Sequence, residues 1–308
     1  MSVLSQEIDR YLSIRRSLGY TLSSDERVLR SFVSFADTEN TDHVSSPLFL
    51  RWKEAFGKAN NRTWAHRLST VRVFARWLHS LDARHEVLPQ SLLPSRFRRP
   101  RPYIYSEDEV RQIVQAAAEL PSHNGIRPLT CSTLFGLIAV TGLRVSEALA
   151  LNASDVDLAS GVLTVRKGKF GKARLVPVAD SVRVQLAEYA CERDRLLGAP
   201  SQAFFVADHG ARLTDCGARY SFAAASRAIG LRSFESYRRH GHGPRIHDLR
   251  LAVRTLLSWY RNRDNPSQEM IKLSTYLGHA DPTNTYCYVE AVPELLELAA
   301  KRAEEVQP

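Results

Sequence analysis

Two short motifs in the C-terminal two-thirds of the chain contain arginines that could bind one phosphate group. In TGLRVSEALAL, residues 141–151, Arg144 follows the helix-ending glycine and precedes Glu147 by one helical turn. In IHDLR, His247 and Arg250 are spaced i, i+3 and share one helical face. Two guanidinium forks can clamp the nonbridging oxygens of one phosphodiester. They would neutralise the charge that grows as phosphorus becomes five-coordinate, a role that Mg²⁺ fills in other phosphoryl-transfer sites.

Three further motifs supply groups for proton transfer and for attack on phosphorus. The basic turn KGKFGK contains Lys167 and Lys169, YLGH ends in His279, and TNTYCYV contains Tyr286 and Tyr288. Lysine can protonate a leaving 5′ oxygen, histidine can exchange a proton near neutral pH, and tyrosine can attack phosphorus and hold it as an ester. From the residues alone, either lysine and either tyrosine could act. Because the sequence shows no convincing carboxylate cluster for a metal, the set predicts DNA strand cleavage through a covalent protein–DNA bond, with no cofactor.

The five motifs, in this order, resemble the tyrosine recombinase (phage integrase) family from about residue 3 to residue 300. The stretch HADPTNTYCYVEAVPELL is more similar to integrases of mobile elements than to chromosome-resolving recombinases. The resemblance implies a 3′-phosphotyrosyl intermediate and a homotetramer that exchanges strands between paired sites in double-stranded DNA through a Holliday junction. The hairpin lysine is matched by aligning KFGKARLVP on Arg174 and Pro177. The resemblance assigns catalysis to Arg144, Lys169, His247, Arg250, His279 and the nucleophile Tyr288, with Glu147 in a supporting role.

One departure from the family pattern keeps other functions open. After Arg250 the chain runs directly into LAVRTLL, whereas the family usually has a short His-Thr-Phe-like segment before its apolar helix. This difference suggests, as an alternative, a noncatalytic DNA-binding member of the same fold that assists a partner recombinase. A second alternative is an enzyme similar to type IB topoisomerases, which shares the chemistry but has no partner site.

The first 86 residues are expected to form a helical DNA-binding domain of the core-binding, SAM-like type. Leu4, Ile8, Tyr11, Leu12 and Leu18 fall on one face of a first helix, and Ser23 with Glu26 forms a capping-box pattern before a second. A helix over about 61–80 has an apolar face and, on another face, a basic stripe. We expect DNA contacts from the stripe arginines Arg62, Arg72 and Arg76.

Residues 87–105 are expected to be a linker, because four prolines favour an extended path. Its arginines are expected to bind DNA: Arg96, Arg98, Arg99 and Arg101. Residues 106–308 are then the catalytic domain, which begins with the capping box Ser106 to Glu109. The expected fold is mainly α, with a small β-hairpin or sheet, in an α+β catalytic domain that ends in a C-terminal helix. Its strands are predicted at 162–166 and 174–178, and its helices at about 107–119, 129–140, 180–196, 214–229 and 247–262.

The composition agrees with a DNA-binding protein. The 308 residues include 42 Lys and Arg against 33 Asp and Glu, a net charge of +9, and seven of the basic residues are Lys. Arginine binds phosphate through two parallel hydrogen bonds, so this balance favours a polyanionic partner. An apolar run of about 18 residues or a signal-peptide core is not found, and the four cysteines form no CxxC pair. We therefore expect a cytoplasmic protein.

Overall fold

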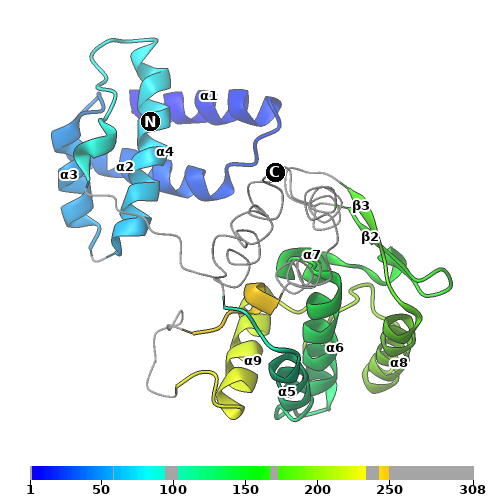
Figure 1. The fold of residues 1–308 in the computed structure, drawn as a ribbon. Coiled ribbons are helices and arrows are strands. Elements are labelled where there is room, and N and C mark those ends of the chain that lie inside the picture. The colour runs from blue at the N-terminus through cyan, green and yellow to red at the C-terminus, as the bar shows by residue number, and fades with distance from the viewer. Residues whose placement is uncertain (1, 58, 94–102, 167–172, 234–242, 250–308) are drawn as a thin grey trace, which may run out of the picture. The chain divides into compact units, whose positions relative to one another are not determined.

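The computed structural model describes residues 2–57, 59–93, 103–166, 173–233 and 243–249. The chain divides into two compact units, residues 1–100 and 101–308, so the division lies within the segment predicted to be a linker (Figure 1). Four predicted catalytic residues lie outside the described residues: Lys169, Arg250, His279 and Tyr288. The linker arginines, the predicted helix at about 247–262 beyond residue 249, and the predicted C-terminal helix also lie outside them.

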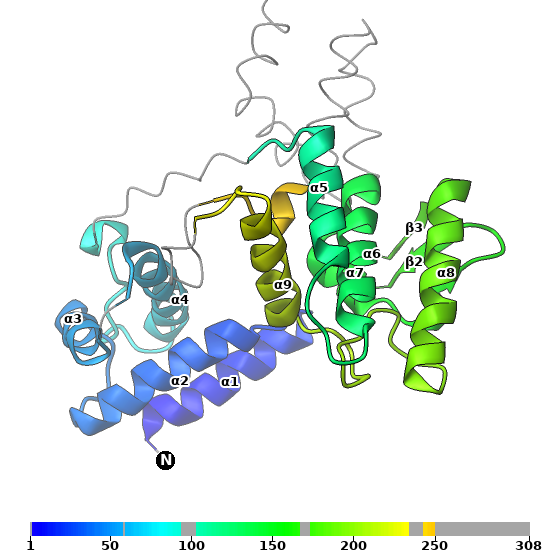
Figure 2. The same cartoon turned by 90° about the horizontal axis from the view of Figure 1, so that it is seen from below.

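The described part of unit 1 is helical. Its α-helices are α1 (Val3–Ser17), α2 (Ser23–Thr38), α3 (Ser46–Ala55) and α4 (Asn61–His79), followed by a short 3₁₀ turn, η1 (Gln90–Leu92). In Figure 2, α1 and α2 run side by side, and both helices contact α4. The core is rich in aromatic rings: Trp52 of α3 is 2% exposed and lies 5.3 Å, centroid to centroid, from both Phe32 and Trp64. Such edge-on pairs add to the stability that burial provides.

Two local predictions for unit 1 are wrong. Ser23 is the first residue of α2 and not its cap, because Leu22 takes the N-cap position in the left-handed conformation, with φ of 49° and no side-chain capping bond. Glu26, the other half of the predicted capping box, instead accepts hydrogen bonds from Arg16 and Arg30. Leu18 is 66% exposed because α1 ends at Ser17, so it does not extend the buried face of that helix.

The described part of unit 2 is built around α6 (Ile126–Thr141), a helix in which more than half of the residues are buried. Figures 1 and 2 show α5 (Glu107–Ala118), α8 (Asp180–Leu197) and α9 (Asp215–Ala228) around it, and α6 contacts all three. The predicted capping box at the start of α5 is confirmed, since Ser106 and Glu109 exchange both hydrogen bonds. The described part of unit 2 also contains three shorter helical pieces: α7 (Val145–Ala150), η2 (Ala153–Asp155) and η4 (Ile246–Leu249).

The predicted hairpin is part of a three-stranded antiparallel sheet in order β1-β2-β3. Strands β2 (Val162–Val165) and β3 (Arg174–Pro177) pair with Val165 opposite Arg174, and the added strand β1 (Val156–Asp157) pairs with β2. The mainly α fold with a small sheet is therefore confirmed. Because side chains alternate between the faces of a strand, Arg174 and the buried Val176 lie on the same face of β3.

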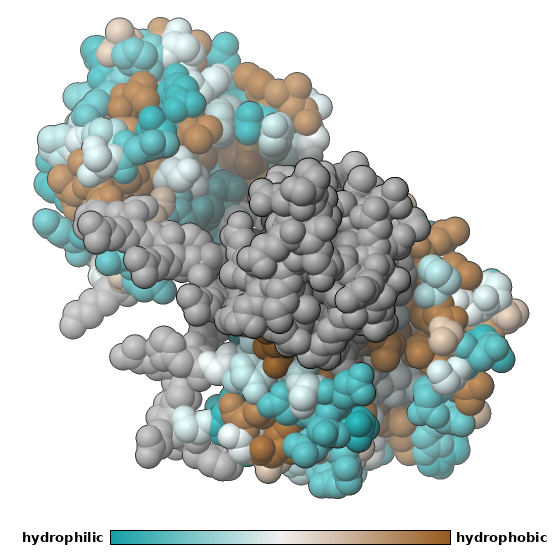
Figure 3. All heavy atoms as spheres, in the orientation of Figure 1, coloured by the Kyte–Doolittle hydropathy of each residue, from teal (hydrophilic) through white to brown (hydrophobic). Residues whose placement is uncertain are grey.

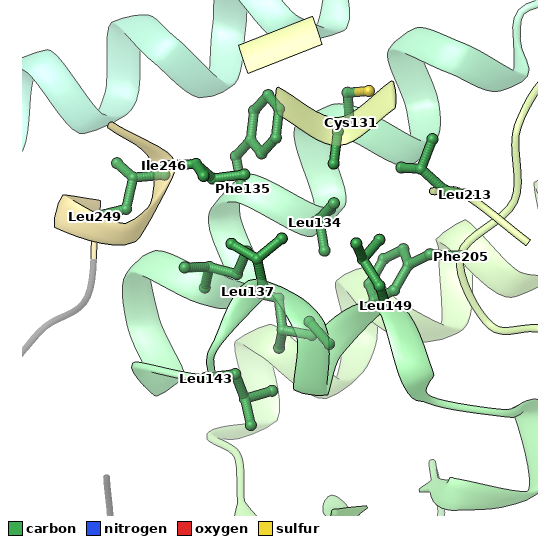
Figure 4. Close-up of a cluster of buried hydrophobic side chains, with 14 of the residues drawn as sticks. Cys131, Leu134, Phe135, Leu137, Leu143, Leu149, Phe205, Leu213, Ile246 and Leu249 are labelled. Atoms are coloured by element: carbon green, nitrogen blue, oxygen red, sulfur yellow. The ribbon is translucent and has the colours of Figure 1, made fainter. Parts of the chain in front are cut away.

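The core of unit 2 joins the segments that carry two of the predicted catalytic residues. Figure 4 shows Phe135 and Leu137 of α6 gathered with Ile246 and Leu249 of η4, and all four are at most 2% exposed. Leu143, also fully buried, lies next to Arg144 in the chain, and Leu249 lies two residues after His247. Burial of Leu143 and Leu249 fixes the backbone near Arg144 and His247. On the face shown in Figure 3, hydrophilic and hydrophobic residues of the described part of the chain are intermixed.

Candidate active site

A sharp turn between α6 and α7 places Arg144. Gly142 ends α6 with φ of 65°, a left-handed conformation that glycine adopts without strain, and its N–H donates to the carbonyl of Ile138. Leu143 then inserts into the core, and Arg144 becomes the N-cap residue of α7 in an extended conformation. In the motif, the glycine therefore ends one helix, the apolar residue anchors the turn in the core, and the arginine begins the next helix.

The predicted supporting residue, Glu147, is the centre of an ion-pair network. It is 3% exposed, and its carboxylate accepts hydrogen bonds from the backbone N–H and Nη1 of Arg144. Arg174 binds the same carboxylate with a two-pronged contact, Nη1 to Oε1 at 3.1 Å and Nη2 to Oε2 at 2.8 Å. Burial raises the pKa of Glu147, but the hydrogen bonds and charges of Arg174 and Arg144 outweigh it and hold the pKa at about 2. Glu147 is therefore ionised near neutral pH.

Sequence reasoning missed the structural role of Arg174. Its side chain is only 16% exposed, and it belongs to the sheet 27 positions after Glu147. The sequence did contain a signal for this role. Side chains alternate between the two faces of β3, and an arginine on the core-facing side of a strand needs a buried acid as a partner.

His247 lies on η4, whose apolar residues Ile246 and Leu249 pack against α6. The neighbouring Asp248 accepts hydrogen bonds from the backbone N–H and the guanidinium of Arg245, at 2.8 to 3.0 Å. The carbonyl of Arg245 in turn accepts a hydrogen bond from the hydroxyl of Tyr105 at 3.2 Å. This set of contacts fixes the backbone on both sides of His247, whose side chain is half-buried.

The turn that contains Lys169 is flanked by two ion pairs. Directly after β2, Arg166 pairs with Asp155, a carboxylate that is 3% exposed and also accepts a hydrogen bond from the backbone N–H of Asn152. At the start of β3, Arg174 pairs with Glu147. The two strands that lead into and out of the turn are thus both attached to buried carboxylates.

The arginine stripe of α4 differs in detail from its prediction. Arg62 and Arg76 are exposed, whereas Arg72 is half-buried and its Nε donates to the carbonyl of Leu88 at 2.7 Å. Arg72 therefore already has a structural partner through one of its nitrogens. A further arginine of the same helix, Arg67, went unnoticed in the sequence: its guanidinium lies 3.9 Å from the ring centre of Phe56 and 4.5 Å from that of Trp64. Burial lowers the pKa of Arg67.

The described part of the chain shows neither a grouped set of metal ligands nor a membrane-spanning helix. Among those residues, no three His, Cys, Asp or Glu side chains are grouped so as to hold a metal ion. No helix described in the structure is long and apolar enough to cross a membrane.

The family model called Phage integrase family matches residues 104–294, which include every predicted catalytic position. The chain belongs to this family. It is 39% identical to the integrase/recombinase y4rB of Sinorhizobium fredii over 99% of this chain and 98% of that protein. It is also 31% identical to the tyrosine recombinase XerD of Caulobacter vibrioides, over 76% of this chain and 72% of XerD.

Solved integrase structures share the fold of this family member. One is the integrase of transposon Tn1549 in complex with transposon right end DNA, with a TM-score of 0.67, 14% identity and 99% of each chain covered. Another is a lambda integrase dimer bound to a core site, with a TM-score of 0.61, 19% identity and coverage of 92% of this chain and 76% of that one. At these identities the likeness concerns the fold, and it confirms the fold class predicted from the motifs.

Proposed function

We propose that this integrase-family protein is a site-specific DNA recombinase that cleaves and rejoins DNA through a 3′-phosphotyrosyl intermediate. One observation carries the proposal: Arg144 is held against a buried, ionised Glu147 in the segment that the family model matches. An arginine oriented in this way is suited to bind a phosphate through defined hydrogen bonds, which is more specific than charge attraction alone.

In the proposed reaction, the Tyr288 oxygen attacks the scissile phosphorus, and the bond to the 5′ oxygen breaks. Lys169 donates the proton that the departing 5′-hydroxyl needs, and His247 and His279 take up or return protons during attack. Arg144 and Arg250 bind the nonbridging oxygens while negative charge grows on them. The 5′-hydroxyl of another strand then attacks the phosphotyrosyl bond and releases Tyr288. Because each bond broken is replaced by an equivalent one, the reaction needs no external energy source.

The biological setting that we propose is a mobile element. The motif stretch before and after Tyr288 is similar to integrases of such elements, and the Tn1549 structure contains transposon end DNA. We further propose a homotetramer on two DNA sites, because a lambda integrase structure of the same fold holds a tetramer on a Holliday junction. The arginines of the linker and of α4 would supply contacts to the DNA backbone.

A nicked suicide substrate tests the proposal. Double-stranded oligonucleotides that tile the DNA beside the gene are nicked near each candidate cleavage point, so that the short 5′-hydroxyl fragment diffuses away after cleavage and the covalent adduct accumulates. We expect an adduct with the parent protein, none with Tyr288→Phe, and a normal yield with the matched control Tyr286→Phe. An adduct that depends on Tyr286 and not on Tyr288 would show that the nucleophile is misassigned.

The two alternatives give different results in the same experiments. A noncatalytic DNA-binding member would shift the oligonucleotides in a gel but form no adduct with any of them, and that result would overturn the proposal. The segment directly after Arg250 is the feature that favours this alternative. A topoisomerase-like enzyme would relax a supercoiled plasmid that lacks the site, whereas we expect the recombinase to leave such a plasmid supercoiled.

A further inference from the structure

We propose that Arg174 is a positioning residue for cleavage: through their shared carboxylate, Glu147, it sets the orientation and the effective charge of Arg144. The inference rests on the proposed function, because it concerns the phosphate-binding role of Arg144. It adds a residue outside the predicted catalytic set and assigns it to a role in the same site.

The geometry of the shared carboxylate supports this role. Oε1 of Glu147 accepts one hydrogen bond from Nη1 of Arg144 and one from Nη1 of Arg174. Oε2 accepts one from the backbone N–H of Arg144 and one from Nη2 of Arg174. Each oxygen therefore binds both arginines, and the carboxylate cannot rotate without breaking contacts to each of them. Removal of Arg174 would free Glu147 to reorient and would release the group that orients Arg144.

The charges of Arg144, Glu147 and Arg174 also support this positioning role. An isolated pair of Arg144 and Glu147 would be formally neutral and would attract a phosphate poorly. With Arg174, two guanidiniums share one carboxylate, and these three side chains together carry one net positive charge. The three side chains are 15%, 2% and 16% exposed, so solvent screens this charge less than it would on an open surface. Arg174 thus offsets the negative charge of Glu147 beside Arg144.

Arg174 also attaches strand β3 to the same cluster. It is the first residue of β3 and lies opposite Val165, the last residue of β2, so it sits at the base of the turn that contains Lys169. A displacement of β3 would break the contact to Glu147 and disturb Arg144. In this arrangement, the first arginine and the base of the lysine turn are positioned by a single carboxylate.

Arg166 provides a matched control at the other strand end. It too pairs with a carboxylate that is 3% exposed, Asp155, but its own side chain is 62% exposed and no described contact joins it to Glu147. An ion pair with a solvated arginine contributes little to stability. If only the attachment of the turn mattered, the loss of Arg166 and the loss of Arg174 would have similar consequences.

The first test is the single-turnover rate of adduct formation on a suicide substrate, measured with the full chain. For Arg174→Met we expect a rate about 10- to 100-fold lower at unchanged DNA affinity. For Arg174→Lys we expect an intermediate rate because the two-pronged contact is lost, and for Arg166→Met a rate near that of the parent.

On a substrate with a methylphosphonate at the scissile position, which lacks the negative charge, the rate defect of Arg174→Met should shrink. The double variant Arg144→Ala with Arg174→Met should be no slower than Arg144→Ala alone, since Arg174 acts through Arg144. Equal rates for Arg174→Met and Arg166→Met, or additive losses in the double variant, would overturn the inference.

A second test does not depend on activity. In the free protein labelled with ¹⁵N-arginine, the guanidinium signal of Arg144, assigned by its loss in Arg144→Ala, should shift or broaden in Arg174→Met and stay in place in Arg166→Met. An unchanged Arg144 signal in Arg174→Met would overturn the inference even if the protein cleaves DNA. If the parent protein forms no adduct while the signal shifts as expected, the proposed function fails and the positioning of Arg144 by Arg174 stands.

Discussion

Arginines are used in two different ways in the two units of this chain. In unit 2, Arg144 is 15% exposed and is bound through its backbone and its guanidinium to a buried carboxylate. In unit 1, Arg62 and Arg76 are exposed on α4. A cation that stabilises a transition state must be held in place before the reaction, whereas a cation that adds affinity for DNA needs only to lie near a phosphate. The burial and the bonding partners of an arginine therefore indicate whether it can stabilise a transition state or only add affinity for DNA.

The largest effect is expected from Arg144→Ala. Loss of a donor aimed at developing charge costs about 100- to 1,000-fold in rate at comparable sites, so adduct formation should fall by at least this factor. Affinity for the DNA should change little, because it depends on many backbone contacts. Single-turnover cleavage and a gel-shift titration on the same oligonucleotide measure the two quantities. A loss of affinity as large as the loss of rate would place Arg144 with the arginines of α4 instead of in a catalytic site.

A smaller effect, on stability, is expected from the pH dependence of Glu147. Its pKa is about 2 in the folded protein and near its ordinary value of 4.5 when unfolded. A lowered folded-state pKa gives stability that is complete above the unfolded pKa and is lost as the pH falls toward the folded pKa. The parent protein should therefore lose stability between about pH 5 and pH 2. In Glu147→Gln this part of the pH dependence should disappear, and at pH 7 the variant should be less stable by about 3 kcal/mol, since two arginines lose a buried partner.

Thermal unfolding of the parent and of Glu147→Gln across that pH range makes this measurement. Arg51→Ala is a suitable control, because Arg51 is exposed and pairs with Glu39 on the surface of unit 1. Identical pH profiles for the parent and Glu147→Gln would mean that the network around Glu147 does not stabilise the fold.

The smallest effect is expected from the arginines of α4, and it concerns salt dependence. If Arg62 and Arg76 each neutralise one phosphate, replacement of both with alanine should lower the slope of log affinity against log salt by about 1.8. The rate of cleavage at saturating protein should stay the same. Arg51→Ala should leave the slope unchanged, because Glu39 already offsets that charge. A slope that is the same in the double variant and the parent would remove α4 from the DNA interface.

The success of the sequence predictions depended on how local the determinants were. The start of α5 was predicted correctly because Ser106 and Glu109 cap each other within one turn. The same pattern at Ser23 and Glu26 failed, because Arg16 of the preceding helix and Arg30 compete for the Glu26 carboxylate. Strand β1 was missed because two residues are too few for an alternation to be recognised.

For the site, motif order placed Arg144 and Glu147 next to each other correctly because both belong to one turn of helix. The sequence could not predict the contact between Glu147 and Arg174, since it requires the sheet to pack beside α7 and joins residues 27 positions apart. Nor could the stripe on α4 reveal that Arg72 is bound to the carbonyl of Leu88, because that carbonyl belongs to the segment after the helix. Long-range ion pairs of this kind depend on tertiary packing, which periodicity does not describe.

The identity of the residue that carries the DNA is the most direct test of the proposed cleavage reaction. The adduct trapped on a suicide substrate is digested with protease and nuclease, and the modified peptide is sequenced by mass spectrometry. We expect the 3′-phosphate of the cleaved strand on the oxygen of Tyr288 and a free 5′-hydroxyl on the released fragment. A phosphate attached to any other residue, or a 5′-phosphate in the bond to the protein, would contradict the account.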